Sequence, residues 1–253
     1  MKYEDDVPEL GEFKLPYPKN PPLVIDTNGI ENGIIIEVEG MDGSGKSSQV
    51  KILTEKLAKE YKKVIYINFI HSEYLRNILL KTKWENSDIY TFTFMYMMGL
   101  SNVYHREIVP KLKEGYIVLL DRYIYTIISK ALVEKKVNEA WIRGCLSIFK
   151  EPNMKFFIDT PVDICLERKK KDNKFLSYWE CGGNIFDVDN MRKEYNQNIF
   201  DNKFLEYQSI IQEIYMRFIN KDEWVVINGN NSFEKINEEI YKSIKKYIKN
   251  WKS

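Results

Sequence analysis

Residues 40–47 read Gly40-Met41-Asp42-Gly43-Ser44-Gly45-Lys46-Ser47, which matches the pattern G-x-x-x-x-G-K-[ST]. The apolar run 34–38 precedes this segment and predicts a strand, and the residues after it predict a helix that ends near Tyr61. A strand before such a segment and a helix after it form the context in which it holds phosphate groups. We therefore interpret residues 40–47 as a P-loop that binds a nucleoside triphosphate.

The residue types of this segment have chemical reasons. Glycines let the backbone curl so that successive N–H groups point at phosphate oxygens, and the following helix adds the positive end of its dipole. Lys46 supplies a positive charge to the β- and γ-phosphates, and Ser47 supplies a hydroxyl to Mg²⁺. With ATP and Mg²⁺ as the expected cofactors, the residues predicted to hold them are Gly40, Asp42, Gly43, Ser44, Gly45, Lys46, Ser47 and Ser48.

Short apolar runs alternate with longer helical patterns along most of the chain. This alternation predicts an α/β fold with a doubly wound, five-stranded parallel sheet. The strands are expected at 34–38, 64–69, 116–120, 155–158 and 224–227, and the helical segments between them are expected to end near 61, 113, 149 and 218. A last helix at 232–251 carries an apolar stripe formed by Phe233, Ile236, Ile240, Ile244, Tyr247 and Trp251.

Composition limits the range of partners and compartments. Lys and Arg number 38 and Asp and Glu number 37, a balance that does not indicate a nucleic-acid or membrane-surface partner. No apolar run is long enough to span a bilayer, and the acidic first residues do not resemble a secretory signal. The three cysteines lie far apart and suggest neither a zinc site nor a disulfide framework, so we expect a reducing, cytoplasmic environment.

The chain divides into a short arm and one large domain. Residues 1–32 contain several prolines and end in Asn-Gly turn signals, so we interpret them as an extended N-terminal arm. Residues 33–253 are long enough for one P-loop kinase domain. A polar, basic stretch after the fourth expected strand predicts a helical lid at about 168–186 that closes over bound nucleotide.

Two polar residues, Asp121 and Arg122, follow the third expected strand. A carboxylate at the carboxyl end of a strand beside the P-loop strand can hold Mg²⁺ through water, and the adjacent arginine can reach a transferring phosphoryl group. A simple surface ion pair is the alternative. We favour function, and assign Ser47 and Asp121 to the metal ion.

A basic cluster extends from Arg168 to Lys174 at the end of a predicted helix. Its lysines are explained by the helix dipole, which favours cations near a C-terminus. The planar guanidinium of Arg168 fits a phosphate group better than an ammonium does. The predicted catalytic residues are therefore Lys46, Arg122 and Arg168.

Together these residues resemble the thymidylate kinase family, over about residues 33–250. The segments that carry the resemblance are Glu39–Gln49, Glu107–Gly115, Asp121–Tyr123, Ile158–Pro161, Glu167–Arg168 and Ile227–Asn230. The resemblance implies a nucleoside-monophosphate-kinase-like fold and transfer of the γ-phosphate of ATP to dTMP or a related acceptor. It also implies that Asp42 lies near the sugar of the acceptor, that Arg122 contacts its phosphate and that Arg168 assists transfer.

Two segments depart from the family pattern. Residues 68–73 replace an Arg-Glu-Pro-Gly-like stretch, and residues 99–102 lack an arginine that in the family helps to hold the monophosphate and base. The acceptor is expected to contact Asp42, Phe69, Arg76 and Arg122. Because a charged contact is missing near Leu100, the departures also predict that dTMP itself is a poor acceptor.

Other functions remain compatible with the same cradle. One is a kinase for a nucleoside or another small hydroxyl acceptor, in which Asp42 or Glu73 would act as a base. Another is a non-catalytic nucleotide-binding protein. Within the lid, the segment 177–183 contains Tyr178 and Trp179, which would either cover a ligand or anchor the lid on the domain. The partners expected are small nucleotides, and a homodimer is one open arrangement.

Overall fold

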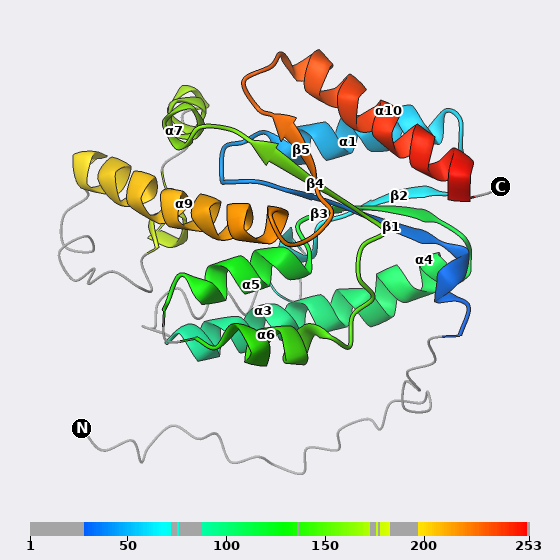
Figure 1. The fold of residues 1–253 in the computed structure, drawn as a ribbon, viewed down its shortest axis with the longest axis horizontal. Coiled ribbons are helices and arrows are strands. Elements are labelled where there is room, and N and C mark those ends of the chain that lie inside the picture. The colour runs from blue at the N-terminus through cyan, green and yellow to red at the C-terminus, as the bar shows by residue number, and fades with distance from the viewer. Residues whose placement is uncertain are drawn as a thin grey trace, which may run out of the picture.

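The computed structural model describes residues 28–71, 75, 88–135, 137–172, 176, 178–182 and 197–251 (Figure 1). The strands are β1 (Ile34–Glu39), β2 (Val64–Ile67), β3 (Ile117–Asp121), β4 (Met154–Asp159) and β5 (Val225–Asn228). The α-helices are α1 (Lys46–Ala58), α3 (Ile89–Val103), α4 (Val109–Lys113), α5 (Ile124–Leu132), α6 (Glu139–Leu146), α7 (Val162–Lys171), α9 (Gln197–Ile219) and α10 (Phe233–Trp251). A π-helical turn at Tyr104–Ile108 joins α3 to α4, and short 3₁₀ helices lie at Ile30–Asn32, Phe69–His71 and Tyr178–Cys181.

The five strands form one parallel sheet in the order β2-β3-β1-β4-β5, which confirms the predicted fold class. The register places Val38 opposite Asp121 of β3 and Glu39 opposite Phe157 of β4. The chain leaves β1 toward α1 at the point where the connections diverge to the two sides of the sheet. In open parallel sheets, ligands bind at the carboxyl ends of the strands at this point.

Helices cover both faces of the sheet. Figure 1 shows α1 and α10 on one side of the strands and α3, α5 and α6 on the other. The alternation in β1 explains the two cores, because Ile34, Ile36 and Val38 belong to the α1/α10 core whereas Ile35 belongs to the α3/α5/α9 core. Glu37 and Glu39 share the parity of Ile35, so β1 directs two carboxylic acids toward the second core.

The last helix differs slightly from its predicted stripe. Its buried apolar residues are Ile236, Ile240, Ile244 and Ile248. Phe233 and Trp251, which the pattern placed in the stripe, are 36% and 37% exposed. A 19-residue helix is about 28 Å long whereas the six-residue β1 spans about 20 Å, so the helix is longer than the strands on which it can bury its first and last residues.

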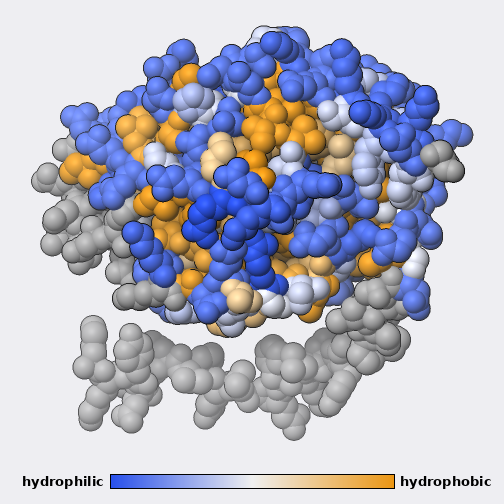
Figure 2. Space-filling model, in the orientation of Figure 1, coloured by the Kyte–Doolittle hydropathy of each residue, from blue (hydrophilic) through white to orange (hydrophobic). Residues whose placement is uncertain are grey.

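The first described residues pack on the domain. The turn Ile30–Asn32, which the sequence assigned to the arm, packs against α4, and Asn32 Nδ2 donates a hydrogen bond to the Lys113 carbonyl oxygen at 3.2 Å. The face seen in Figure 2 is mostly hydrophilic, with apolar side chains in separate areas. Within the described ranges, no helix has both the length and the apolar character that crossing a membrane requires.

Candidate active site

The P-loop has the backbone that its glycines predict. Gly43 has a φ of +91° and Gly45 a φ of +93°, in the left-handed region that favours glycine. A Cβ at Gly43 would lie 2.5 Å from the carbonyl oxygen of Cys165, so the loop can approach α7 closely only with glycine at this position. Lys46 then begins α1, which aligns the N-terminus of that helix with the loop.

Lys46 is buried and faces back onto the loop. Its Nζ donates a hydrogen bond to the Met41 carbonyl oxygen at 2.9 Å and lies 3.7 Å from Asp42 Oδ1. Burial lowers the pKa of Lys46 to about 8, and the charge of Arg122 acts in the same direction while Asp42 opposes it. The pKa of the loop lysine is therefore close to physiological pH.

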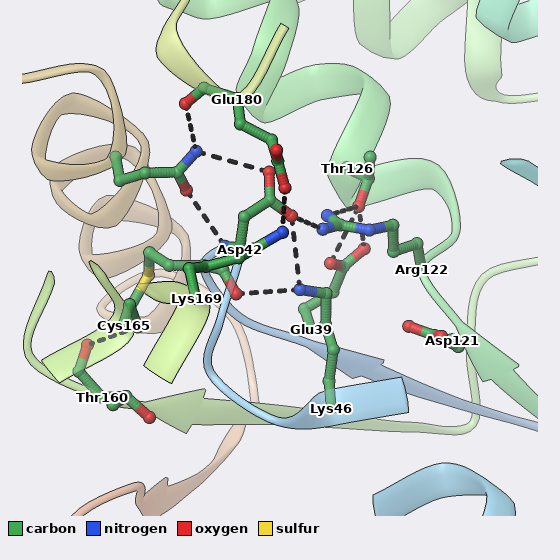
Figure 3. A network of polar contacts seen from close by, with 12 residues as sticks. Glu39, Asp42, Lys46, Asp121, Arg122, Thr126, Thr160, Cys165, Lys169 and Glu180 are labelled. Carbon is green, nitrogen blue, oxygen red and sulfur yellow. Dashed lines mark hydrogen bonds and ion pairs between the residues drawn. The ribbon is translucent and has the colours of Figure 1, made fainter. Parts of the chain in front are cut away.

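Asp42 lies between two cations, as Figure 3 shows. Its Oδ1 forms an ion pair with Arg122 Nη2, and the two side chains are 15% and 14% exposed. Burial alone would raise the pKa of the Asp42 carboxyl, but the charges of Arg122 and Lys46 hold this pKa well below its usual range. The carboxylate thus joins the two cations that the sequence predicted to act on phosphate.

Arg122 is held in place by a buried carboxylate that the sequence analysis did not identify as functional. Its guanidinium Nη1 donates to Thr126 Oγ1 at 3.4 Å, and Thr126 Oγ1 donates to Glu39 at 2.7 Å. Glu39 also accepts the backbone N–H of Tyr123 at 3.2 Å. One fully buried acid at the end of β1 therefore fixes the turn that carries Arg122.

Asp121 ends β3 and is also fully buried. Its Oδ2 accepts hydrogen bonds from Asn68 Nδ2 at 2.8 Å and from the Tyr66 hydroxyl at 3.1 Å. Its Oδ1 has no hydrogen-bond partner among the residues that the structure describes. A buried carboxylate oxygen without a protein donor fits a water molecule or a hydrated cation at this position.

The described segment 178–182, which lies within the predicted lid, contacts side chains of α3, α7 and α9. Lys169 forms an ion pair with Glu180, and Trp179 stacks on Phe92 of α3 with ring centroids 5.1 Å apart. Gln208 of α9 accepts the Asp42 N–H at 3.1 Å and donates to the Glu180 carbonyl oxygen at 3.0 Å. The ring of Trp179 therefore packs on the domain through Phe92, a contact that the anchoring role requires.

Arg168 reaches the P-loop from α7. Its Nη1 donates to the Ser44 carbonyl oxygen at 3.3 Å, and its Nη2 donates to the Gly229 carbonyl oxygen at 2.9 Å. The side chain thus connects the phosphate loop to the turn after β5. It lies where a cation can act on the phosphates of a nucleotide held by the loop.

A pocket of about 620 Å³ joins these groups. The residues that line it are Asp42, Gly43, Gly45, Lys46, Ser47, Ser48, Asn68, Ile70, Arg122, Arg168, Lys169, Asp172 and Glu180. Three of its cations, on α1, α7 and the turn after β3, converge from segments far apart in the sequence. The lining is mainly polar and charged, which suits a phosphorylated ligand.

Most of the predicted site residues line this pocket, but Gly40, Ser44, Asp121 and Phe69 do not. Phe69 is 1% exposed and packs edge-on against Tyr96 in the core, while its neighbours Asn68 and Ile70 line the pocket. Arg76 lies outside the described residues. Sequence reasoning missed Glu39, Thr126 and Gln208. An acid inside an apolar strand was an available signal for Glu39, whereas no local pattern marks the other two.

Comparison with known proteins identifies the family. The sequence model of the family described as "Thymidylate kinase" matches residues 38–240. A protein of Saccharolobus solfataricus named "Probable thymidylate kinase 2" is 31% identical over 221 residues, which cover 86% of this chain and 98% of that protein. The chain belongs to the thymidylate kinase family.

Further relatives come from bacteria. A "Thymidylate kinase" of Staphylococcus epidermidis is 30% identical over 226 residues, covering 85% of this chain and 98% of that protein. A "Thymidylate kinase" of Thermosipho africanus is 26% identical over 222 residues, covering 85% of this chain and 99% of its own. Membership of the thymidylate kinase family confirms the predicted enzyme class, an ATP-dependent kinase built on a P-loop.

Proposed function

We propose that this chain transfers the γ-phosphate of ATP to dTMP or a closely related nucleoside monophosphate. The observation that carries the proposal is the arrangement of Lys46 and Arg122 on either side of Asp42 in one pocket. A P-loop lysine addresses the donor phosphates, and an arginine beyond it is positioned for an acceptor phosphate. The printed names of the relatives support dTMP as the acceptor.

Each charged residue then has a separate task. The backbone of residues 43–47 cradles the donor phosphates, and Lys46 and Arg168 neutralise the charge that develops during in-line transfer. Arg122 orients the acceptor, because its planar fork can grip two phosphate oxygens. We propose that the lid closes over the nucleotides and excludes water, which would otherwise compete as an acceptor.

Mg²⁺ is the expected cation of this site. The hydroxyl of Ser47, which lines the pocket, and the unpartnered Oδ1 of Asp121 are the oxygen donors that would hold it, the second through a water molecule. When bound, such a cation neutralises charge on the phosphates and aligns their oxygens.

A feature of helix α3 supports a second candidate function, in which the preferred acceptor is related to dTMP but is not dTMP itself. Leu100, at the place where the family usually carries a cation, is fully buried among apolar residues. The sequence-based prediction that dTMP binds poorly therefore stays open to measurement. Steady-state rates with dTMP, dUMP, dCMP, UMP, AMP and thymidine test both candidates, since the proposal requires a monophosphate of the pyrimidine series to be the preferred acceptor. Preference for a free nucleoside, or no turnover with any acceptor, would contradict it.

The same assay with Arg122→Lys tests the acceptor-side role of Arg122. Replacing a bidentate fork by a point charge removes about 1.5–3 kcal/mol of contact, so the acceptor KM is expected to rise about 10- to 100-fold while the KM for ATP changes little. A stable Arg122→Lys protein with unchanged acceptor kinetics would show that Arg122 only pairs with Asp42.

A further inference from the structure

Lys130 is a buried cation for which the proposed mechanism has no use. It lies on α5 and is 9% exposed, with its Nζ 5.6 Å from the ring centroid of Tyr207. Among the described residues, its Nζ forms no ion pair and no hydrogen bond. Burying a lysine whose ammonium has no hydrogen-bonded anion is destabilising, and a ligand that accepts a hydrogen bond from Nζ would offset that cost.

The position of Lys130 on α5 directs it to the acceptor side of the site. It follows Thr126 by four residues and therefore lies on the same helix face, one turn further from the P-loop. Thr126 contacts Arg122 directly. The positive charge of Lys130 is also one of those that lower the pKa of Asp42, after Arg122 and Lys46.

The surroundings of Lys130 are aromatic and contain few other cations. Tyr207 is 1% exposed and Tyr96 is 6% exposed, and the charge of Lys130 opposes the rise that burial causes in the pKa of Tyr96. The helix α3, which carries Tyr96 and packs against α5, has no charged residue between Ile89 and Val103. The charge of Arg122 also acts on Tyr96 and Tyr207. Buried aromatic side chains beside two cations and the Asp42 carboxylate are a combination that suits a nucleoside monophosphate, which offers a flat base and several oxygens.

We propose that Lys130 binds an oxygen of the nucleoside part of the acceptor, on its base or its sugar, and so determines acceptor specificity. This inference rests on the proposed function. Lys130 lies six residues after the first residue of α5, a helical rise of about 9 Å away from the turn that carries Arg122. Arg122 can therefore hold the acceptor phosphate while Lys130 donates to an oxygen beyond that phosphate.

The direct test is Lys130→Met, which keeps the length of the side chain and removes its charge. The KM for the acceptor is expected to rise about 10- to 100-fold, with the KM for ATP and kcat changed by less than about threefold. Lys155→Met is the matched control, because Lys155 Nζ also lies over aromatic rings, 5.2 Å from Tyr125 and 5.6 Å from Trp224, but its charge is not among the main ones that lower the pKa of Asp42. Lys130→Arg, which keeps the charge, is expected to recover part of the affinity and serves as the readout if Lys130→Met does not fold.

A comparison of acceptors identifies the oxygen. Lys130→Met should reduce the preference for dTMP and dUMP over dCMP if the contact is the O4 carbonyl of the base, or should alter the ratio of UMP to dUMP if it is the 2′-hydroxyl of the sugar. An equal loss for all four nucleotides indicates an oxygen that they share, such as O2 of the base or the 3′-hydroxyl. An unchanged acceptor KM overturns the inference, and an equal loss for all four nucleotides with unchanged binding of thymidine overturns the assignment to the nucleoside part. If the wild-type enzyme phosphorylates none of them, the proposed function fails separately. Equilibrium titration with dTMP then decides the inference, which requires tighter binding to wild type than to Lys130→Met.

Discussion

Arg122 has a φ of +73° and is the one non-glycine residue with a positive φ among the described residues. A side chain in this region costs roughly 1 kcal/mol, so surrounding contacts must hold it. The Arg122 N–H donates to the Val38 carbonyl oxygen at 3.3 Å, and Glu39 accepts the next backbone N–H. The strained turn directs the guanidinium of Arg122 away from β3 and toward Asp42, with which it forms an ion pair.

Lys46 should make ATP binding dependent on pH. Because burial lowers its pKa to about 8, a growing share of Lys46 is neutral as the pH rises past that value. Only the ammonium attracts the triphosphate, so ATP binding must take up a proton above this pKa. The dissociation constant for ATP, measured by titration from pH 6.5 to 9.5, should be nearly flat below pH 7 and rise by up to about tenfold per pH unit above pH 8.

The variant Lys46→Arg supplies the control for that measurement. A guanidinium stays charged throughout this range, so the dependence on pH should disappear in the variant even if its absolute affinity is lower. A wild-type affinity that stays constant between pH 7.5 and 9.5 would show that Lys46 is fully protonated when ATP arrives.

The part of the proposed lid that the structure describes is held by contacts between separate elements. The short helix Tyr178–Cys181 is linked to α7 by Lys169 and Glu180, and α7 is linked to α9 by Lys170 and Asp201. A four-residue helix has too few internal hydrogen bonds to be stable alone, so its position depends on these links and on the stacking of Trp179. Gln208 forms hydrogen bonds to both Glu180 and Asp42, and so links this short helix to the P-loop.

Trp179→Ala should loosen the lid and let water into the site. The stacked ring pair with Phe92 is worth about 0.5–1.5 kcal/mol beyond the area it buries, so the open lid should become up to about tenfold more populated. The rate of ADP formation without an acceptor, divided by the rate with acceptor, should increase by up to the same factor. This ratio is measured with the same coupled assay under both conditions.

The matched control is Trp141→Ala. Trp141 also packs edge-on against aromatic side chains of α3, with ring centroids 5.5 Å from Tyr90 and 5.8 Å from Phe94, but it belongs to α6. Its removal should lower stability without changing the hydrolysis ratio. Equal ratios in the two variants would mean that Trp179 has no special part in excluding water.

At the scale of the whole molecule, a carboxylic acid buried in the central strand β1 makes the stability of the fold depend on pH. Glu37 is fully buried in β1, and neither carboxyl oxygen has a hydrogen-bond partner among the described residues. Burial, followed by the negative charge of Glu39, raises the pKa of Glu37 well above its usual value. The folded protein therefore holds a proton that the unfolded chain releases near pH 4.5.

Glu37→Gln should change how stability depends on pH. For a carboxyl with a raised pKa in the fold, stability is greatest below the unfolded pKa and is lost as the pH rises toward the folded pKa. That loss is about 1.4 kcal/mol per pH unit inside the window. The neutral amide has no such loss, so the variant should gain stability relative to wild type as the pH rises above about 4.5. Urea unfolding at several pH values measures this difference.

Glu55→Gln, an exposed change on α1, controls for the loss of one carboxylate. It should leave the dependence on pH close to that of the wild type. If Glu37→Gln and wild type show parallel curves, Glu37 has the same pKa in both states and the proposed buried proton does not exist.

Local patterns were sufficient for the fold and for half of the site. The P-loop, the five strands and the Asp121-Arg122 pair were all predicted, because each depends on residues that are neighbours in the chain. Trp179 was ambiguous, because its role depends on Phe92, which lies 87 positions earlier. Phe69 was predicted to bind substrate but packs in the core, because the chain turns into a 3₁₀ helix directly after β2.

The sequence by itself determined the phosphate cradle, the parallel sheet and the kinase family, since these follow from backbone geometry and from side chains at fixed spacing. Only the tertiary structure decided that Asp42 joins Lys46 to Arg122, that Glu39 and Thr126 hold the strained turn, and that Lys130 is buried over the ring of Tyr207. The physical reason is distance along the chain. Asp42 and Arg122 are 80 residues apart, and their charges shift each other's pKa only because β1 and β3 are adjacent in the sheet.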